Sequence, residues 1–236
     1  SRSYAADVPV GSAIINGRKA VYLLVTKRAD ASTLDVVRNV RNALPDMQAV
    51  LPPDIKVSLE FDQSPTVTNA VRTVITEAIL GAALVGLMVL LFLRDWRGMM
   101  IVIINIPLAL AGAIFLLWIS GQSFNLMTLG GLALAIGILV DESTVELENI
   151  HTQLRHTGSV PVAVRRGNRE TAVPRLLALL CMLAVFAPSF LMTGAIRALF
   201  VPLSLAVGYS MICSYLLSST LVPVLAAWLL KPQPGH

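Results

Sequence analysis

Two adjacent carboxylates inside a hydrophobic segment are the residues of this sequence most suited to chemistry. Asp141 and Glu142 follow a stretch, residues 98–140, that contains no Asp, Glu, Lys or Arg. An ionisable group inside a membrane costs a few kcal/mol, so two together indicate a function. Burial and a neighbouring like charge both favour the protonated form, and such a pair titrates as one coupled unit. We therefore predict proton transfer through this segment, with Asp141 as the main carrier and Glu142 as its partner.

Other polar residues near the hydrophobic segments are weaker candidates. Glu77 lies one turn into the first apolar segment, where it could reach water or pair with a cation outside this chain. Glu146 and Glu148 are interpreted as solvated residues at the cytoplasmic interface. Glu148 and His151 have the Glu-x-x-His spacing of carboxylate-bridged metal sites, but no second such motif completes one. We interpret His151 as solvated at a helix end, and predict no metal and no cofactor other than the coupling proton.

Helical spacing places small residues beside the first carboxylate. At about 100° per residue, Gly130, Ala133, Gly137, Asp141 and Thr144 lie on one narrow helix face. Small residues allow a neighbouring helix to approach closely. We expect a second helix to pack on this face, with the acid and the hydroxyl in the contact. The second carboxylate then points about 100° away, toward another neighbour or a wet cavity.

The composition agrees with a membrane setting. The 236 residues are 56% hydrophobic and 14% charged, with a mean hydropathy of +0.74, whereas soluble domains are about 25% charged. Charged residues are also absent from 176–196 and 198–230, and about 18 apolar residues can cross a bilayer. An ordinary soluble enzyme is excluded. The net charge of +4 does not indicate nucleic-acid binding, because the basic residues flank the apolar runs.

The chain divides into two regions. Residues 1–66 are predicted to form a small α+β segment, the ferredoxin-like part of a larger domain: strands at 12–15 and 20–26 around an Asn-Gly turn, a helix from Ser32, and a strand at 55–61. Residues 73–230 are predicted to form an α-helical transmembrane bundle. Its five spans are expected at about 73–93, 99–119, 126–150, 174–193 and 199–230, with a cytoplasmic interfacial helix over 152–173.

The distribution of basic residues predicts the orientation. With residues 1–66 outside, the inner connections contain most of the cations: Arg94, Arg97, Arg155, Arg165, Arg166, Arg169, Arg175 and Lys231. The short outer loops contain Arg197. Cytoplasmic loops are enriched in Lys and Arg, so residues 1–66 are expected to face away from the cytoplasm. Cys181 and Cys213 lie inside apolar runs and give no disulfide framework.

Several motifs resemble those of resistance-nodulation-division (RND) efflux pumps. The string Gly137-Ile-Leu-Val-Asp-Glu-Ser-Thr-Val-Glu-Leu-Glu-Asn149 is similar to the motif of their fourth transmembrane helix. Residues 61–65, 92–97, 123–128 and 231–232 resemble the segments that flank the second to sixth helices. The resemblance covers nearly the whole chain. The relay carboxylates of the family align with Asp141 and Glu142, and the Glu departs from the Asp-Asp usual in the multidrug branch.

The resemblance implies a fragment of a larger machine. Residues 1–66 would end a periplasmic porter subdomain, and the five spans would be helices two to six of twelve. Family members are homotrimers of the bacterial inner membrane that work with a periplasmic adaptor and an outer-membrane channel. They export organic or drug-like substrates in exchange for protons. The relay lysine of the family would come from a second transmembrane half, so the lipid bilayer and the rest of the permease are the expected partners, and nucleic acid is not.

Three alternatives remain open from the sequence. An intramembrane aspartyl protease needs two carboxylates that face each other from separate helices, whereas here both acids are neighbours on one. A member of the wider superfamily could handle lipids or metals, or assist protein export, instead of exporting drugs. The chain could also be a truncated product whose motif survives without a partner.

Overall fold

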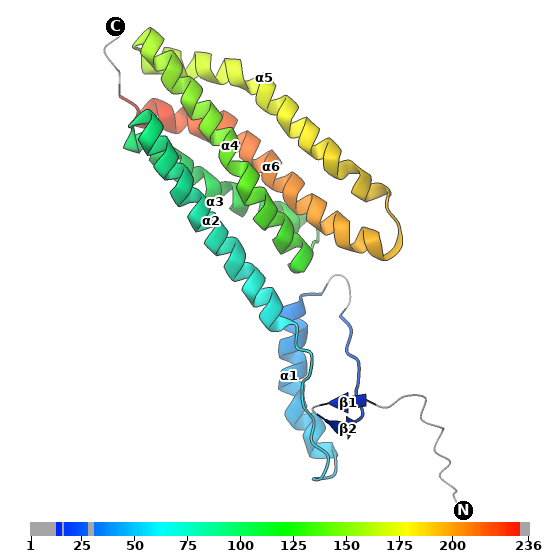
Figure 1. Cartoon of the computed structure of the whole chain (residues 1–236). Helices are drawn as coiled ribbons and strands as arrows, with labels where there is room; N and C mark the ends of the chain where they lie inside the picture. Colours follow the sequence, from blue (N-terminus) through cyan, green and yellow to red (C-terminus); the bar gives the residue numbers. More distant parts are fainter. Residues whose placement is uncertain (1–12, 16, 28–30, 232–236) are drawn as a thin grey trace, which may run out of the picture.

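The computed structural model describes residues 13–15, 17–27 and 31–231. Within these ranges, the side chains of Arg18, Lys19, Leu93, Val140, Asp141 and Ala195 are outside the description. The described elements are β1 (Ala13–Ile15), β2 (Arg18–Ala20), α1 (Thr33–Val50), α2 (Ser64–Leu93), α3 (Trp96–Ile119), α4 (Leu126–Thr157), α5 (Val160–Phe186), the 3₁₀ helix η1 (Ala187–Leu191) and α6 (Gly194–Leu229). The helices α2 to α6 form a bundle, and α1 with the two strands lies beyond one end of it (Figure 1).

The first strand and the first helix form where the sequence predicts them, and the second strand of the hairpin begins two residues earlier than expected. β1 and β2 pair antiparallel, and Gly17 in the turn has φ +78°, a conformation that favours glycine. The other turn residue, Asn16, lies outside the described residues. The Ser32 side chain accepts a hydrogen bond from the backbone N–H of Asp35 and so caps α1.

The strands expected at 20–26 and 55–61 are mostly wrong. Only Ala20 of the first segment belongs to a strand, and the second segment has no regular secondary structure and ends at Phe61 with φ +54°. Gln48 of α1 binds the second segment instead, because its Nε2 donates to the carbonyl of Ile55 (2.6 Å) and its Oε1 accepts from the N–H of Val57 (2.8 Å). Alternation can mark a strand, but a sheet also needs a partner strand. The ferredoxin-like arrangement therefore has weak support here.

The five predicted spans are confirmed in number. Within the described residues, five helical segments are long and apolar enough to cross a membrane: Ser64–Phe92, Trp96–Ile119, Leu126–Thr157, Val160–Leu191 and Ile196–Leu229. They form an α-helical bundle, as expected from the composition.

The separate helix expected over residues 152–173 is not present. Those residues are the last turns of α4 and the first turns of α5, because Gly158 and Ser159 form the whole connection between the two helices. Gly158 ends α4 with φ +64°, as is common one residue past a helix end. Pro174, expected at the start of a span, lies inside α5.

The ends of the membrane helices show why the flanking motifs have these residues. Arg94 ends α2 in the left-handed conformation, and Asp95 caps α3 by accepting a hydrogen bond from the N–H of Arg97 at 3.0 Å. Asn125 caps α4, and it forms a reciprocal capping box with Thr128. These caps fix the places at which the chain reverses between helices.

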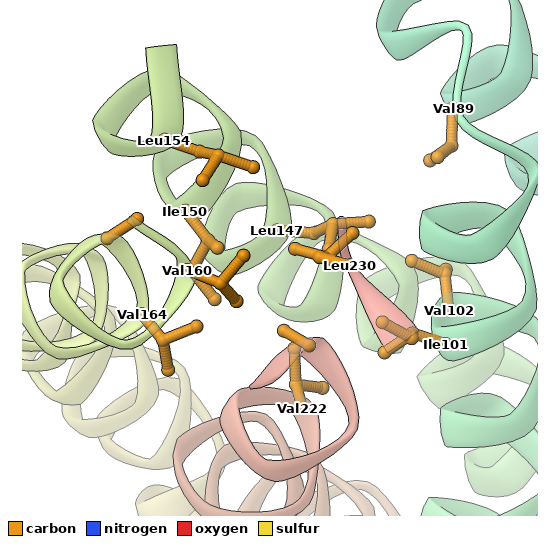
Figure 2. Packing of buried hydrophobic residues seen from close by; sticks show 12 residues of the cluster. Val89, Ile101, Val102, Leu147, Ile150, Leu154, Val160, Val164, Val222 and Leu230 are labelled. Atoms are coloured by element: carbon orange, nitrogen blue, oxygen red, sulfur yellow. The ribbon is translucent and has the colours of Figure 1, made fainter. Parts of the chain in front are cut away.

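The central helix of the bundle is α4, which packs against α2, α3, α5 and α6. Two hydrophobic clusters lie along it. The cluster in Figure 2 surrounds the second half of α4 with side chains from all five helices, and its labelled members are Val89, Ile101, Val102, Leu147, Ile150, Leu154, Val160, Val164, Val222 and Leu230, which directly follows α6. The other surrounds the first half, where Leu132, Ala135, Ile136 and Leu139 of α4 meet α3 and α6.

Candidate functional site

Polar residues of α4 lie between its two hydrophobic clusters. Leu139 belongs to one cluster and Leu147 to the other, and Glu142, Ser143 and Glu146 are buried between them. Glu146 is 0% exposed and Glu142 is 7% exposed. Because these acids are four residues apart, they lie one turn apart on one side of the helix, about 6 Å along its axis.

Neighbouring helices contribute further buried polar side chains at this level. We call the whole group the polar layer: Asn105 of α3, Glu142, Ser143 and Glu146 of α4, Thr171 and Arg175 of α5, and Ser214 and Ser218 of α6. Buried polar groups at this density are costly unless they are hydrogen-bonded. The partners of each member therefore decide what the layer can do.

Arg175 forms an ion pair with Glu146. Its Nη2 lies 2.8 Å from Glu146 Oε2, and the Arg175 side chain is 4% exposed. Thr171, one turn earlier on α5, donates its hydroxyl to the same carboxylate oxygen. The positive charge of Arg175 and the negative charge of Glu146 therefore compensate each other inside the bundle, where both side chains are buried.

The other atoms of Arg175 contact α5 and α6. Nη1 donates to the hydroxyl of Ser218 (2.6 Å) and Nη2 to the side-chain oxygen of Asn168 (3.1 Å). The guanidinium lies 5.9 Å from the centroid of the Tyr215 ring, within the range of a cation–π interaction. Among the described residues, Arg175 Nε and Glu146 Oε1 have no hydrogen-bond partner. The ion pair is therefore only partly satisfied.

Glu142 has an even less complete environment. Both of its carboxylate oxygens are buried without a hydrogen-bond partner among the described side chains. The next residue, Ser143, accepts a hydrogen bond from Asn105 of α3. The hydroxyl of Ser214 on α6 lies beside the Glu142 carboxylate, and the nearest paired cation is Arg175, which binds Glu146 one turn further along α4. An unpartnered carboxyl group in such a position is ready to bind a proton, a water molecule or a cation.

Asp141 lies on α4, and its side chain is outside the described part of the structure. Two members of the small-residue face expected beside it, Gly130 and Gly137, are exposed, and a Cβ at either would meet no described residue within 4 Å, whereas Ala133 and Thr144 are half-buried. The close helix approach occurs one residue away, at Gly131, where a Cβ would lie 2.7 Å from the carbonyl oxygen of Leu203 on α6. The expectation of a neighbour on the Gly130–Gly137 face is therefore not met within the described residues.

Two further candidates lie apart from the polar layer. Glu77 is exposed on α2, and no hydrogen bond or ion pair to a described residue is seen for it. His151 is 4% exposed, so its interpretation as a solvated residue is wrong. Its Nε2 lies 3.4 Å from Asp95 Oδ2 at the start of α3, whereas Glu148 is exposed. Within the described residues, no three His, Cys, Asp or Glu side chains are grouped closely enough to hold a metal ion.

Residues 6–236 match the family model described as the AcrB/AcrD/AcrF family. The chain belongs to this family. The resemblance to RND efflux permeases is thereby confirmed, and the five apolar helices together with this membership indicate an inner-membrane protein.

Curated relatives of this AcrB/AcrD/AcrF family member are named as multidrug resistance proteins. "Multidrug resistance protein MdtC" of Pectobacterium atrosepticum is 34% identical over 220 residues, which are 93% of this chain and 21% of the relative. The protein of the same name from Yersinia pestis bv. Antiqua (strain Angola) is 34% identical over 222 residues, and that from Pantoea ananatis is 32% identical over 217, each covering 92% of this chain and 21% of the relative. The chain thus spans about a fifth of the length of these relatives.

Two residues of the polar layer were misplaced from the sequence. Glu146 was expected to be solvated and Arg175 to lie in a cytoplasmic connection, but both are buried and paired. The available signal was the repeat of four: Glu142 and Glu146 on one helix, and Thr171 and Arg175 on the next. Four-residue spacing places each pair on one face, which is the pattern of two helices that meet through polar side chains.

Proposed function

We propose that this chain is the part of a proton-driven RND efflux transporter that contains the intramembrane carboxylates. Asp141 is the principal proton carrier, and Glu142 is its coupled partner. Binding of a proton neutralises the pair and weakens its attraction to a cation on a facing helix, so that the helices shift. The intact permease transmits this shift to a periplasmic porter domain that carries the substrate.

The observation that carries the proposal is the buried, unpartnered carboxyl group of Glu142 in the centre of a hydrophobic bundle. A permanently ionised, unpaired carboxylate at that position would be strongly unfavourable. A group that gains and loses a proton during a cycle avoids that cost for part of the cycle. Family membership supports the same role for its neighbour Asp141.

The uncovered face of α4 supports a partner from outside this chain. Gly130 and Gly137 leave room for close approach of another helix, and Asp141 follows Gly137 by one helical turn. We infer that the second transmembrane half of the permease packs on this face and supplies the cation, as the resemblance implies. Protons are the coupling ion, and no other cofactor is part of the proposal.

We further propose that residues 1–66 face the periplasm. Figure 1 shows α1 at one end of the bundle, whereas the α2–α3 turn, the α4–α5 connection and the end of α6 lie at the other. That second end contains the exposed cations Arg94, Arg155, Arg165, Arg166, Arg169 and Lys231, and cytoplasmic ends are rich in such residues.

The permease is proposed to work as a homotrimer with a periplasmic adaptor and an outer-membrane channel. Organic, drug-like molecules are the proposed substrates, because its relatives are named for multidrug resistance.

The test is made in the intact permease that contains this chain, expressed in a bacterium without its own pumps. Asp141→Asn and Glu142→Gln are compared with Glu148→Gln, an exposed acid of the same helix. Accumulation of a fluorescent dye should rise to the level of pump-free cells with Asp141→Asn, rise clearly with Glu142→Gln and stay low with Glu148→Gln. Equal amounts of each permease are verified by immunoblotting. If Asp141→Asn leaves efflux undiminished, the proposal is abandoned.

A further inference from the structure

The ion pair between Glu146 and Arg175 has no part in the function proposed above, although it lies one helical turn from Glu142. Burying two charges needs a compensating reason, since a well-packed apolar pair is often as stable. The pair is also incomplete, because Arg175 Nε and Glu146 Oε1 lack partners among the described residues. Its arrangement is therefore poorly explained by stability alone.

Two buried carboxylates of α4 lie on the side of the helix that Arg175 contacts. Glu146 already binds its Nη2 at 2.8 Å, and Glu142 is buried one helical turn before Glu146 on the same side of α4. Among the described residues, neither Glu142 oxygen makes a hydrogen bond of full geometry, and the hydroxyl of Ser214 on α6 lies beside the carboxylate. When Glu142 carries a proton, Arg175 is balanced by Glu146 alone, and when Glu142 loses its proton, one guanidinium faces two anions one turn apart.

We propose that Arg175 is a positioning residue for the α4 carboxylates, and that with Glu146 it sets the pH at which Glu142 releases its proton. This inference rests on the function proposed above and deepens it. The proton-handling site of this chain then extends over about one and a half turns of α4, from Asp141 to Glu146. Part of its counter-charge comes from α5 of the same half of the transporter.

The surrounding elements supply few other charges. From α6, the polar layer receives the hydroxyls of Ser214 and Ser218, and Tyr215 places its ring beside the guanidinium. From α3 it receives the amide of Asn105.

The other charged side chains of α5, which are Arg165, Arg166, Arg169 and Glu170, are exposed, and Arg97 of α3 donates to the carbonyl of Leu229. The charged side chains of α2, Arg72 and Glu77, are exposed, as is Arg94 at its end. On α4 the adjacent acid is Asp141, whose side chain is outside the description, and His151 is paired with Asp95 at the α3 end. Among the described side chains, Arg175 is thus the cation placed to act on Glu142.

The predicted signs follow from charge. Arg175→Gln removes the cation that favours ionised carboxylates, so Glu142 holds its proton to higher pH. Glu146→Gln removes the competing anion and leaves the cation to Glu142, so the proton is lost at lower pH. An opposite charge within about 4–6 Å shifts a carboxyl titration by about one pH unit or more. The double variant Glu146→Gln with Arg175→Gln replaces a neutral pair by two neutral amides, and its titration should return close to that of wild type.

The experiment measures proton-driven transport by the intact permease in proteoliposomes as a function of pH. The alkaline limb of the profile reports loss of the coupling proton. We expect it to move to higher pH in Arg175→Gln, to lower pH in Glu146→Gln, and back toward wild type in the double variant. Arg169→Gln and Glu148→Gln, exposed residues of the same helices, should leave the limb unchanged. The infrared band of protonated carboxyl groups, followed in an Asp141→Asn background, should titrate with the same order of shifts.

The possible failures are distinguishable. If Arg175→Gln and Glu146→Gln keep the alkaline limb at the wild-type pH and only transport more slowly, the ion pair is structural. The inference would then be overturned, while the proposed function would stand. Undiminished transport by Asp141→Asn would instead overturn the function. If a single variant does not accumulate because a buried charge is left unpaired, Arg175→Lys is used. It keeps the charge, so its limb should stay at the wild-type pH, and a shift as large as that expected for Arg175→Gln would contradict the inference.

Discussion

Asp62 is the residue that connects the N-terminal part to the first long helix. Its Oδ1 accepts the backbone N–H of Ser64 at 2.8 Å, and its Oδ2 pairs with Arg41 of α1 at 2.7 Å. The Ser64 backbone N–H, then the Ser64 side chain, and then the Arg41 charge hold the pKa of Asp62 below its ordinary value of 3.8. Ionised Asp62 therefore stabilises the junction above that ordinary value, and the stabilisation is lost as the pH falls through the lowered pKa.

Arg41→Gln should raise the pKa of Asp62 only part of the way toward its ordinary value. The hydrogen bonds to Ser64 remain in this variant, and they are the larger cause of the shift. The measurement is the carboxyl ¹³C chemical shift of Asp62 against pH in the purified protein. Arg38→Gln is the matched control, because Arg38 pairs with Asp35 and not with Asp62. A wild-type titration at the ordinary value would contradict the assigned contacts.

Individual side chains of the polar layer show where sequence reasoning stops. The hydrophobic run before Asp141 was enough to predict a buried carboxylate at this level, and Glu142 is buried there; its proton chemistry remains a proposal. The run could not show which helix covers the following turn, so Glu146 was assigned to solvent. Arg175 was assigned to the cytoplasmic end because the positive-inside rule counts cations near span ends. Its partner lies 29 positions earlier in the sequence, and only the packing of α5 on α4 brings the two together.

At the scale of elements, the crossing of α4 and α5 depends on Gly167. A Cβ there would lie 2.9 Å from Ile150 Cγ1 and 3.1 Å from the Ile150 backbone N and Cα. A backbone contact cannot be relieved by a side-chain rotation, so the helices must separate. The same crossing carries the hydrogen bond from Asn149 to the Gly167 carbonyl at 3.0 Å, and the polar layer begins one turn further along α5.

Gly167→Ala is therefore expected to destabilise the protein by about 1–3 kcal/mol, the usual cost of overpacking. The control is Gly81→Ala on α2, where the added Cβ meets Ile136 Cγ2 at 3.4 Å, an ordinary contact. The measurement is the thermal unfolding midpoint of the purified protein in detergent. An unchanged midpoint in Gly167→Ala would show that α5 does not approach α4 this closely.

At the scale of the whole molecule, hydropathy predicts the number of helices better than their ends. The long runs without charged residues predicted the five membrane-spanning helices, since a helix that crosses a bilayer has to be apolar along its length. The connections were harder to predict. The polar stretch 152–173 suggested a separate surface helix, but in the structure both membrane helices extend through it and meet at Gly158. The sequence predicts a neighbouring helix on the face of α4 with Gly130 and Gly137, but no described residue lies within 4 Å of a Cβ added at either glycine.

The orientation of the bundle can be tested by single cysteines at three exposed positions. Two helices, α2 and α3, separate Ser58 from Ser120, and a third, α4, separates Ser120 from His156. If each helix crosses the membrane once, Ser58 and Ser120 share one side and His156 lies on the other. The native Cys181 and Cys213 are first replaced by alanine, because Cys181 is exposed and would add background labelling.

In intact cells, a membrane-impermeant maleimide should label Ser58→Cys and Ser120→Cys in the full permease, and His156→Cys only after the inner membrane is opened. This pattern follows from placing the cation-rich end of the bundle in the cytoplasm. The reverse pattern would invert the molecule, and protons would then have to enter the polar layer from the opposite end. Labelling of Ser58→Cys and His156→Cys from the same side would be more serious, because one of α2, α3 and α4 could then not span the membrane.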